Sequence, residues 1–194
     1  MRIAKLVTLT AAATLVAATT AGCGGGDDDT EPAPTTAATT NADGTTVAGT
    51  ELKIGDKAVV PFDADKEDSA QIKLVVLKVD KGKVADLERF DLDDKAKKST
   101  VYYVHTVVKN LGPGSLSGKQ VTLYGKVSDE QVVPPVIFGS TFPLCDYEPL
   151  PKKFTKGKVA KGCQVMLAPK HGKISEVQWR PVDNSEPISW TVKK

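Results

Sequence analysis

The chain has 194 residues, of which 40% are hydrophobic and 26% are charged, close to the average for globular proteins. Residues 1–50 hold two of the 26 basic and five of the 24 acidic residues, so residues 51–194 carry a net charge of +5. This excess is well below the dense cationic patch of a nucleic-acid-binding protein, and we expect no nucleic-acid partner. Residues 51–194 are enough for one self-sufficient domain and too few for two.

The N-terminus has the pattern of an export signal. Residues 1–5 carry two positive charges, residues 6–21 form an apolar run with interspersed Thr, and small residues precede Cys23. This order is typical of a signal peptide, which we assign to residues 1–22. The run is short and rich in Ala and Thr, unlike a membrane span of about 20 apolar residues.

Ala21, Gly22 and Cys23 resemble the lipobox of bacterial lipoproteins, in which the Cys is acylated and becomes the mature N-terminus. Thr20 departs from that pattern, because lipoproteins usually have Leu or another aliphatic residue there. The resemblance implies lipidation of Cys23, with palmitate as the expected acyl chain, and a location on the extracytoplasmic face of the cell membrane. The alternative is ordinary signal cleavage, for example after Ala18, which leaves Cys23 as an unmodified thiol.

Residues 23–50 contain almost nothing to bury. They begin with three Gly and three Asp and continue with a stretch rich in Thr, Ala, Pro and Gly. We expect a disordered tether that ends at Thr50. The three Asp are interpreted as a solvated run rather than a metal site, and the composition also matches an O-glycosylated stalk.

From Glu51 onwards, short apolar runs alternate with turn residues, which predicts an all-β domain over residues 51–194. Strands are predicted over 52–60, with a bend at 55–56, over 72–79 and over 101–109, which is the richest in β-branched and aromatic residues. Residues 84–98 are predicted to form a long charged loop with room for one helical turn. Seven or eight short strands favour a two-sheet sandwich over a barrel. The remaining strands are predicted at 121–127, 132–138, 164–168, 174–180 and 188–192.

Two prolines fall within one of these strands. Pro134 and Pro135 lie in the run 132–138. Because proline cannot donate a backbone hydrogen bond to a neighbouring strand, this run is predicted to be an edge strand or an irregular crossing.

The chain has three cysteines, and an odd number in an exported protein needs an explanation. If Cys23 carries lipid, Cys145 and Cys163 remain as a pair, and we predict a disulfide bond between them. Closing a loop of this length stabilises a fold by about 3 kcal/mol. A metal-binding pair is the alternative, but His or Cys partners at ligand spacing are missing from the sequence.

Several strand sequences resemble those of a known group of domains. They are Leu-Lys-Ile-Gly-Asp at 52–56, Val-Tyr-Tyr-Val at 101–104, Val-Val-Lys-Asn at 107–110 and Val-Gln-Trp at 177–179. The pattern resembles the immunoglobulin-like domains of bacterial surface lipoproteins in families of unknown function, related in fold to the mycobacterial immunoprotective extracellular antigen. The resemblance implies an immunoglobulin-like β-sandwich at the cell surface without catalytic residues. The segment between Cys145 and Cys163 departs from it.

No catalytic, cofactor or metal site is predicted. Residues 114–118 have Leu116 where a nucleophile elbow requires Ser, so they are interpreted as a loop. His105, in a predicted strand, and His171, in a predicted turn, have no evident catalytic partner. Residues 63–68 place acidic side chains at alternate positions but lack the Gly and Glu of a calcium loop. Together with 91–94 they are interpreted as solvated loops, with a weak cation site as the alternative.

Two further groups of residues have competing interpretations. Five lysines of the predicted disulfide loop would suit contact with an anionic envelope surface, at about 1 kcal/mol each, although the favoured interpretation is a soluble, charged loop. Trp179 and Trp190 are predicted to be core residues with their indole N–H groups hydrogen-bonded, and a stacking platform for sugars is the alternative. The five lysines are Lys152, Lys153, Lys156, Lys158 and Lys161.

These features lead to a functional prediction. We expect a non-enzymatic binding or interaction domain displayed at the cell surface, with an anionic envelope polymer or another surface protein as partner. One alternative is a carrier of a small apolar ligand, which needs a cavity between the sheets. The other is an envelope hydrolase, which needs clustered carboxylates or a site centred on a His.

Overall fold

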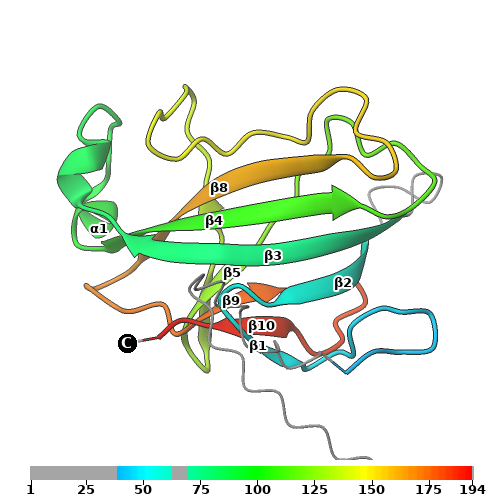
Figure 1. Ribbon diagram of the computed structural model, residues 1–194. Coiled ribbons are helices and arrows are strands. Elements are labelled where there is room, and N and C mark those ends of the chain that lie inside the picture. The colour runs from blue at the N-terminus through cyan, green and yellow to red at the C-terminus, as the bar shows by residue number, and fades with distance from the viewer. Residues whose placement is uncertain (1–38, 63–69, 194) are drawn as a thin grey trace, which may run out of the picture. The chain divides into compact units, whose positions relative to one another are not determined.

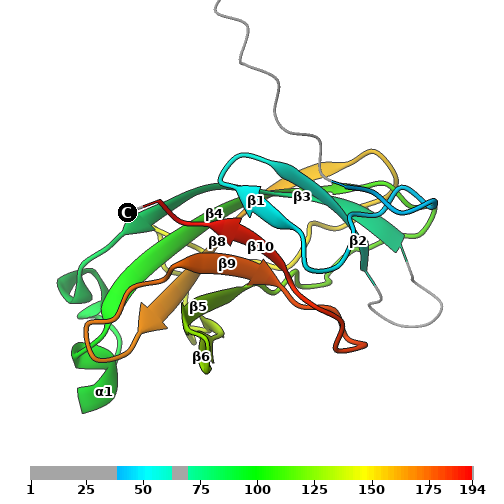
Figure 2. The same cartoon turned by 90° about the horizontal axis from the view of Figure 1, so that it is seen from below.

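The computed structural model of the chain describes residues 39–62 and 70–193. This part is all-β: ten strands form two curled five-stranded sheets (Figure 1). Sheet 1 has the order β1-β10-β9-β5-β6, and sheet 2 has the order β2-β3-β4-β8-β7. Seen from below, β10, β9 and β5 of sheet 1 lie side by side with sheet 2 behind them (Figure 2). No helix of the described part is long and apolar enough to cross a membrane.

The strands have these bounds in chain order: β1 Glu51–Lys53, β2 Lys57–Phe62, β3 Ala70–Lys81, β4 Thr100–Asn110, β5 Tyr124–Ser128, β6 Gln131–Val133, β7 Pro135–Val136, β8 Val159–Ala168, β9 Glu176–Trp179 and β10 Ile188–Thr191. Two short helical turns, η1 (Val84–Leu87) and α1 (Asp94–Lys97), lie in the connection between β3 and β4, where the sequence predicts a long loop with room for one helical turn. The predicted signal peptide, Cys23 and residues 63–68 lie outside the described residues.

The main core lies between the two sheets, and the strands of sheet 2 contribute alternate, inward-facing residues to it. In β3, Ile72, Leu74 and Val76 are fully buried, while the residues between them are partly exposed. β4 and β8 pair over ten positions, from Thr100 opposite Ala168 to Lys109 opposite Val159. The long pairing of β3, β4 and β8, which a bulge in β3 between Val76 and Lys78 interrupts once, forms the centre of sheet 2.

The strand predicted at 121–127 begins later than expected, at Tyr124. Val121 and Leu123 are buried, but their backbone groups bond to a side chain instead of a strand. The Gln164 amide accepts from the Leu123 N–H at 3.0 Å and donates to the Val121 carbonyl at 2.9 Å. This amide replaces the ladder partner that a neighbouring strand would provide, so sequence pattern alone placed the strand boundary wrongly.

The run 132–138 divides at Pro134, which lies between β6 and β7. β6 is an edge strand of sheet 1, and β7 is an edge strand of sheet 2. The chain therefore crosses from one sheet to the other at the prolines, and both segments lie at edges, as expected for residues that cannot donate to a ladder.

The folded part begins before Glu51, which corrects the predicted tether. Thr45 and Thr46 are buried, and the Thr46 N–H donates to the Val59 carbonyl of β2 at 2.7 Å. An Asx turn at Asp43, whose carboxylate accepts from the Thr45 N–H and hydroxyl, holds this segment in a hairpin-like bend. The predicted disorder of 39–50 is wrong because composition does not reveal hydrogen bonds made to a distant strand.

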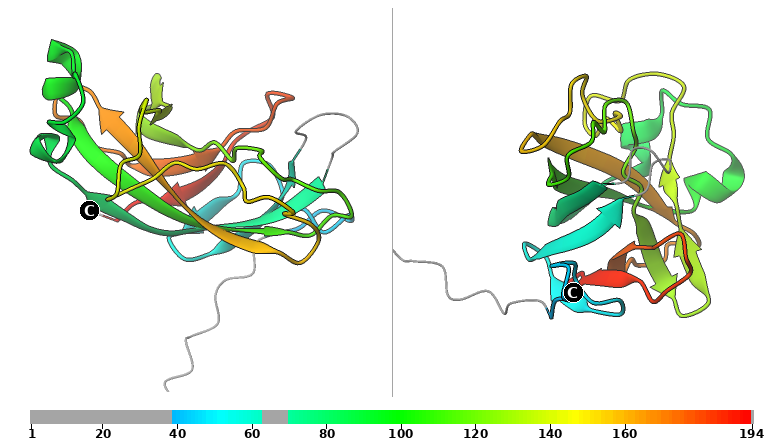
Figure 3. Two further views of the ribbon diagram at one scale, coloured as in Figure 1. Left: turned by 90° about the horizontal axis from the view of Figure 1, so that it is seen from above. Right: turned by 90° about the vertical axis from the view of Figure 1, so that its right-hand side faces the viewer.

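A second, smaller core lies on the outward side of sheet 2. Leu87 of η1, Phe142 and Cys145 pack there on outward-facing residues of β4 and β8. The predicted disulfide is present and joins Cys145 to Cys163 of β8. It fastens the connection between β7 and β8, which runs alongside β8 (Figure 3), to the outside of the sheet.

Candidate functional site

The outward side of sheet 2 is divided into a covered half and an open half. The second core covers the half near the start of β4 and the end of β8, where Val101, Tyr103 and Val165 are buried. Beyond Cys163 nothing in the described residues covers the sheet, and its outward side chains are partly or fully exposed. We call this open half the basic face.

The strand register arranges the basic face in two rows across four strands. The first row is Lys57, Val75, Val107 and Lys161, and the second row is Val59, Lys73, Lys109 and Val159. Both rows contain two lysines and two valines, and no acidic residue interrupts them. Leu77, which is 45% exposed, and Val159, which is 57% exposed, add apolar surface beside the lysines.

The lysines of the basic face are not neutralised within the described part of the chain. Lys57, Lys73, Lys109 and Lys161 form no ion pair with any described residue. Lys73 and Lys109 are direct cross-strand partners, and like charges in this position destabilise a sheet. This pair of like charges therefore lowers the stability of the fold.

The outward side of sheet 1 shows the opposite arrangement. Lys126 lies 3.1 Å from Glu176 and 3.0 Å from Asp129. Gln178 donates to Glu176 at 2.9 Å, and Arg180 donates to Gln178 at 2.8 Å. Burial raises the pKa of Glu176, but the hydrogen bonds from Gln178 and Lys126 outweigh it and leave the pKa below its usual value. The charges of Lys126 and Glu176 thus have partners within the domain, whereas the four lysines of the basic face have no ion-pair partner among the described residues.

The structure separates the five lysines that the sequence grouped together. Lys161 lies on the basic face. Lys158 lies beside the end of β4, where its carbonyl accepts a hydrogen bond from the Asn110 N–H. Lys152, Lys153 and Lys156 are exposed on the loop anchored by the buried Phe154. Sequence reasoning missed Lys57, Lys73 and Lys109, because only the register of β2, β3 and β4 brings them next to Lys161.

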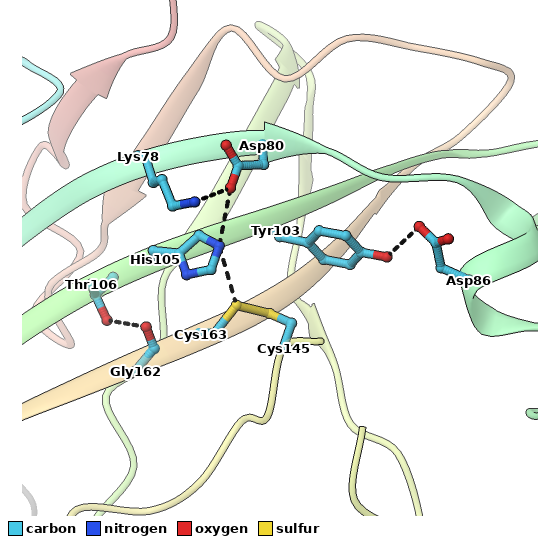
Figure 4. The surroundings of a disulfide bond; sticks show 9 residues. All are labelled: Lys78, Asp80, Asp86, Tyr103, His105, Thr106, Cys145, Gly162 and Cys163. Atoms are coloured by element: carbon cyan, nitrogen blue, oxygen red, sulfur yellow. Dashed lines mark hydrogen bonds and ion pairs between the residues drawn. A yellow bond between two sulfur atoms is a disulfide. The ribbon is translucent and has the colours of Figure 1, made fainter. Parts of the chain in front are cut away.

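His105 lies at the border between the covered and open halves (Figure 4). Its Nε2 is 3.2 Å from the Asp80 carboxylate, which also pairs with Lys78 at 2.6 Å, and 3.9 Å from the Cys163 sulfur. Burial and the Lys78 charge lower the pKa of His105 and outweigh the opposing effect of Asp80. The sulfur beside the imidazole is bonded to Cys145, so it is not a thiol nucleophile while the disulfide is intact.

Figure 4 also shows how Tyr103 connects β4 to η1. Its hydroxyl donates to the Asp86 carboxylate at 2.9 Å. Burial and this neighbouring carboxylate raise the pKa of Tyr103. Hydrogen bonds from the Lys83 N–H and from Tyr103 lower the pKa of Asp86. These contacts fix η1 over the second core and have a structural role.

The other sequence candidates lie in loops and turns. In the 114–118 segment Leu116 is fully buried, and the Ser117 hydroxyl accepts from the Phe154 N–H at 3.0 Å. In 91–94 the Asp93 carboxylate caps α1 by accepting from the Ala96 N–H. His171 is exposed in a turn with a positive φ of 54°. Among the described residues, no group of three or more His, Cys, Asp or Glu side chains could hold a metal ion.

The indole N–H groups of the two tryptophans differ in their hydrogen bonding, which corrects part of the prediction. Trp190 is fully buried, and its indole N–H donates to the Asp56 carbonyl at 2.9 Å. Trp179 is 8% exposed, and its buried indole N–H has no acceptor among the described residues. The expectation of a hydrogen-bonded N–H is therefore wrong for Trp179.

Comparisons with known proteins do not add a functional assignment to this geometry. No family model, no curated protein and no solved structure matches the chain.

Proposed function

We propose that this chain is an exported bacterial lipoprotein whose immunoglobulin-like domain is a non-enzymatic binding module, and that its basic face docks on a phosphate-bearing anionic surface of the cell envelope. The observation that carries the proposal is the pair of Lys–Val–Val–Lys and Val–Lys–Lys–Val rows without acidic residues. An anionic surface would neutralise the repulsion between Lys73 and Lys109 that the isolated domain leaves in place.

The side chains of the face suit a lipid–water boundary. Lysine stems lie along apolar surface while their ammonium groups reach anionic headgroups, and the exposed Leu77 and Val159 contribute apolar contact. Each lysine near an anionic membrane contributes about 1 kcal/mol. If the residues between Cys23 and Thr39 form a flexible coil, the domain stays about 20 Å from its anchor, within reach of the bilayer.

The immunoglobulin-like part of the proposal is supported by the strand order. The first strand pairs in parallel with the last, β10, and antiparallel neighbours continue the sheet to β6. The disulfide differs from that of antibody domains, which joins the two sheets. In this chain, Cys145–Cys163 fastens a loop to the outside of one sheet.

A charge-reversal variant tests the proposed docking. In the full chain carrying Cys23→Ser, so that no acyl anchor contributes, Lys109→Glu is expected to weaken binding to phosphatidylglycerol vesicles at least about tenfold. The same change places opposite charges at Lys73 and position 109, so the free energy of unfolding should rise by a few tenths of a kcal/mol. Cosedimentation and urea unfolding measure the two effects.

Lys173→Glu is the matched control, because Lys173 is exposed in the connection between β8 and β9, outside the basic face. It should bind vesicles like the parent chain. Poly(glycerol phosphate) in a parallel titration distinguishes a wall polymer from lipid headgroups as the source of the phosphates. Equal losses for both lysine variants, or no binding of the parent chain to either probe, would disprove the proposal.

A further inference from the structure

The stretch from β6 to the disulfide differs in composition from the rest of the domain. Residues 131–145, which we call the uncharged segment, form the longest run without a charged side chain in residues 51–194. Three of the six large hydrophobic side chains that are exposed in the described part of the chain belong to it, namely Val132, Ile137 and Leu144. Apolar surface that gathers in one place beside polar surface is typical of a site of contact with another protein or a membrane.

Leu144 lies at the tip of a turn whose two ends are fixed. The Cys145 N–H donates to the Phe142 carbonyl at 3.0 Å, which closes the turn. Pro143 and Leu144 form its centre. Both ends are buried, whereas Leu144 is 59% exposed. Besides proline, turn centres usually carry glycine or small polar residues, so turn formation alone does not account for an exposed leucine at this position.

Contacts of the second core hold the turn in place. The Phe138 ring stacks on Phe90 with centroids 4.0 Å apart, and the Phe142 centroid lies 5.5 Å from that of Phe138. The disulfide attaches the end of the turn, Cys145, to Cys163 of β8 (Figure 4). A turn fixed in this way loses little conformational freedom when it docks on a partner.

The turn adjoins the basic face. Cys163 and Lys161 both lie on the outward side of sheet 2, two positions apart in β8, which is a spacing of about 7 Å along the strand. Because the end of the turn is bonded to Cys163, the apolar turn and the lysine rows are neighbours on one side of the domain. Binding at the interface of an anionic bilayer increases with buried apolar area and with electrostatic attraction, and this side of the domain offers both.

We propose that Ile137 and the turn at Pro143 and Leu144 insert into the headgroup region of a lipid bilayer while the lysines of the basic face contact lipid phosphates. This inference rests on the proposed docking of the basic face, and it names the bilayer rather than a wall polymer as the partner. A glycerol phosphate polymer would engage the lysines but would leave Ile137, which is 73% exposed, without apolar contact. The uncharged segment suits insertion because no charged side chain in it has to leave water.

Serine variants of the full chain carrying Cys23→Ser test the insertion. Leu144→Ser and Ile137→Ser should each weaken cosedimentation with phosphatidylglycerol vesicles about tenfold, because each removes an aliphatic side chain that the bilayer buries. Binding to poly(glycerol phosphate) should stay unchanged. The matched control is Val182→Ser, because Val182 is 84% exposed in the connection between β9 and β10, and this variant should bind vesicles like the parent. All three side chains are exposed, so the midpoints of urea unfolding should agree.

Fluorescence quenching measures the depth of insertion. Leu144→Trp places an indole at the tip of the turn, and bromine atoms on the acyl chains of the vesicles should quench its emission. Trp179 and Trp190 are both buried, so the emission of the parent chain should change little.

Three results would overturn the insertion: vesicle binding by Leu144→Ser equal to that of the parent, equal losses on vesicles and polymer, or no quenching of the added indole. A change from dimer to monomer in Leu144→Ser with unchanged vesicle binding would assign the segment to an interface between copies and would also overturn it. Lys109→Glu separates the two proposals, because it should weaken binding to both probes. If it affects neither while Leu144→Ser still weakens vesicle binding, the docking of the basic face fails alone.

Discussion

At the scale of single residues, buried polar side chains form hydrogen bonds with loop backbone groups that no neighbouring strand pairs. Asn110 is fully buried at the end of β4, where its amide donates to the carbonyls of Gly114 and Phe154 and accepts from the Gly112 N–H. Gln164 does the same for Val121 and Leu123. Both residues satisfy loop backbone that would otherwise be buried without partners, at a cost of about 1–3 kcal/mol per group.

His105 leads to a prediction about pH. Burial holds its pKa in the folded protein below the ordinary value of 6.5, so at mildly acidic pH the unfolded chain binds more protons than the folded one. Stability contributed by neutral His105 is therefore present above pH 6.5 and declines as the pH falls towards the folded pKa. Replacing His105 with Gln should reduce the loss of unfolding free energy between about pH 7.5 and about pH 5.5.

Urea unfolding at the two pH values measures this effect. The matched control is His171→Asn, because His171 is exposed and Asn tolerates its positive φ. An unchanged pH dependence in the His105 variant, or the same reduction in both variants, would contradict the assignment.

At the scale of elements, the disulfide attaches the covering segment to one half of the outward side of sheet 2. It links Cys145 to β8, beside the contacting rings of Phe90, Phe138 and Phe142. The covered half ends at Cys163, and the open lysine rows begin two residues earlier in the strand, at Lys161. The segment fastened by the disulfide is thus the border of the basic face.

Removal of this bond should weaken the fold by about 3 kcal/mol, because the denatured chain gains the freedom of an open loop. We expect this decrease in the unfolding free energy for Cys145→Ala/Cys163→Ala, measured in urea, with Cys23→Ser as the control that leaves stability unchanged. Hydrogen exchange should accelerate in 138–146 and much less in the ladder of β3 and β4. Equal acceleration in both regions would show that the bond stabilises the whole fold rather than the second core in particular.

At the scale of the whole molecule, the proposed anchor determines what the domain can reach. We expect the mature protein extracted from membranes to begin at Cys23 and to carry at least a diacylglycerol group, as measured by intact mass. Cys23→Ser should shift the protein from the membrane fraction to the medium. An unlipidated native chain that begins before Cys23 would leave a freely secreted domain and contradict the lipoprotein proposal.

Much of the β structure could be predicted from the sequence, because alternating burial and turn residues are local properties. The strongest strand expected, 101–109, is β4, and the prolines after Val133 mark the crossing between sheets. The packing of residues 39–50 onto the fold could not be predicted, since it depends on hydrogen bonds to β2. The late start of β5 could not be predicted either, because a distant glutamine replaces a strand partner.

The sequence by itself predicted an all-β domain from residue periodicity and, on the assumption that Cys23 is acylated, the disulfide between Cys145 and Cys163, and both are present in the structure. Only the tertiary structure decided which lysines share a surface and which tryptophan N–H has no acceptor among the described residues. Lys57, Lys73, Lys109 and Lys161 become neighbours through strand register, and Trp179 meets Phe62 through sheet packing. Both depend on contacts between distant segments, which no local pattern encodes.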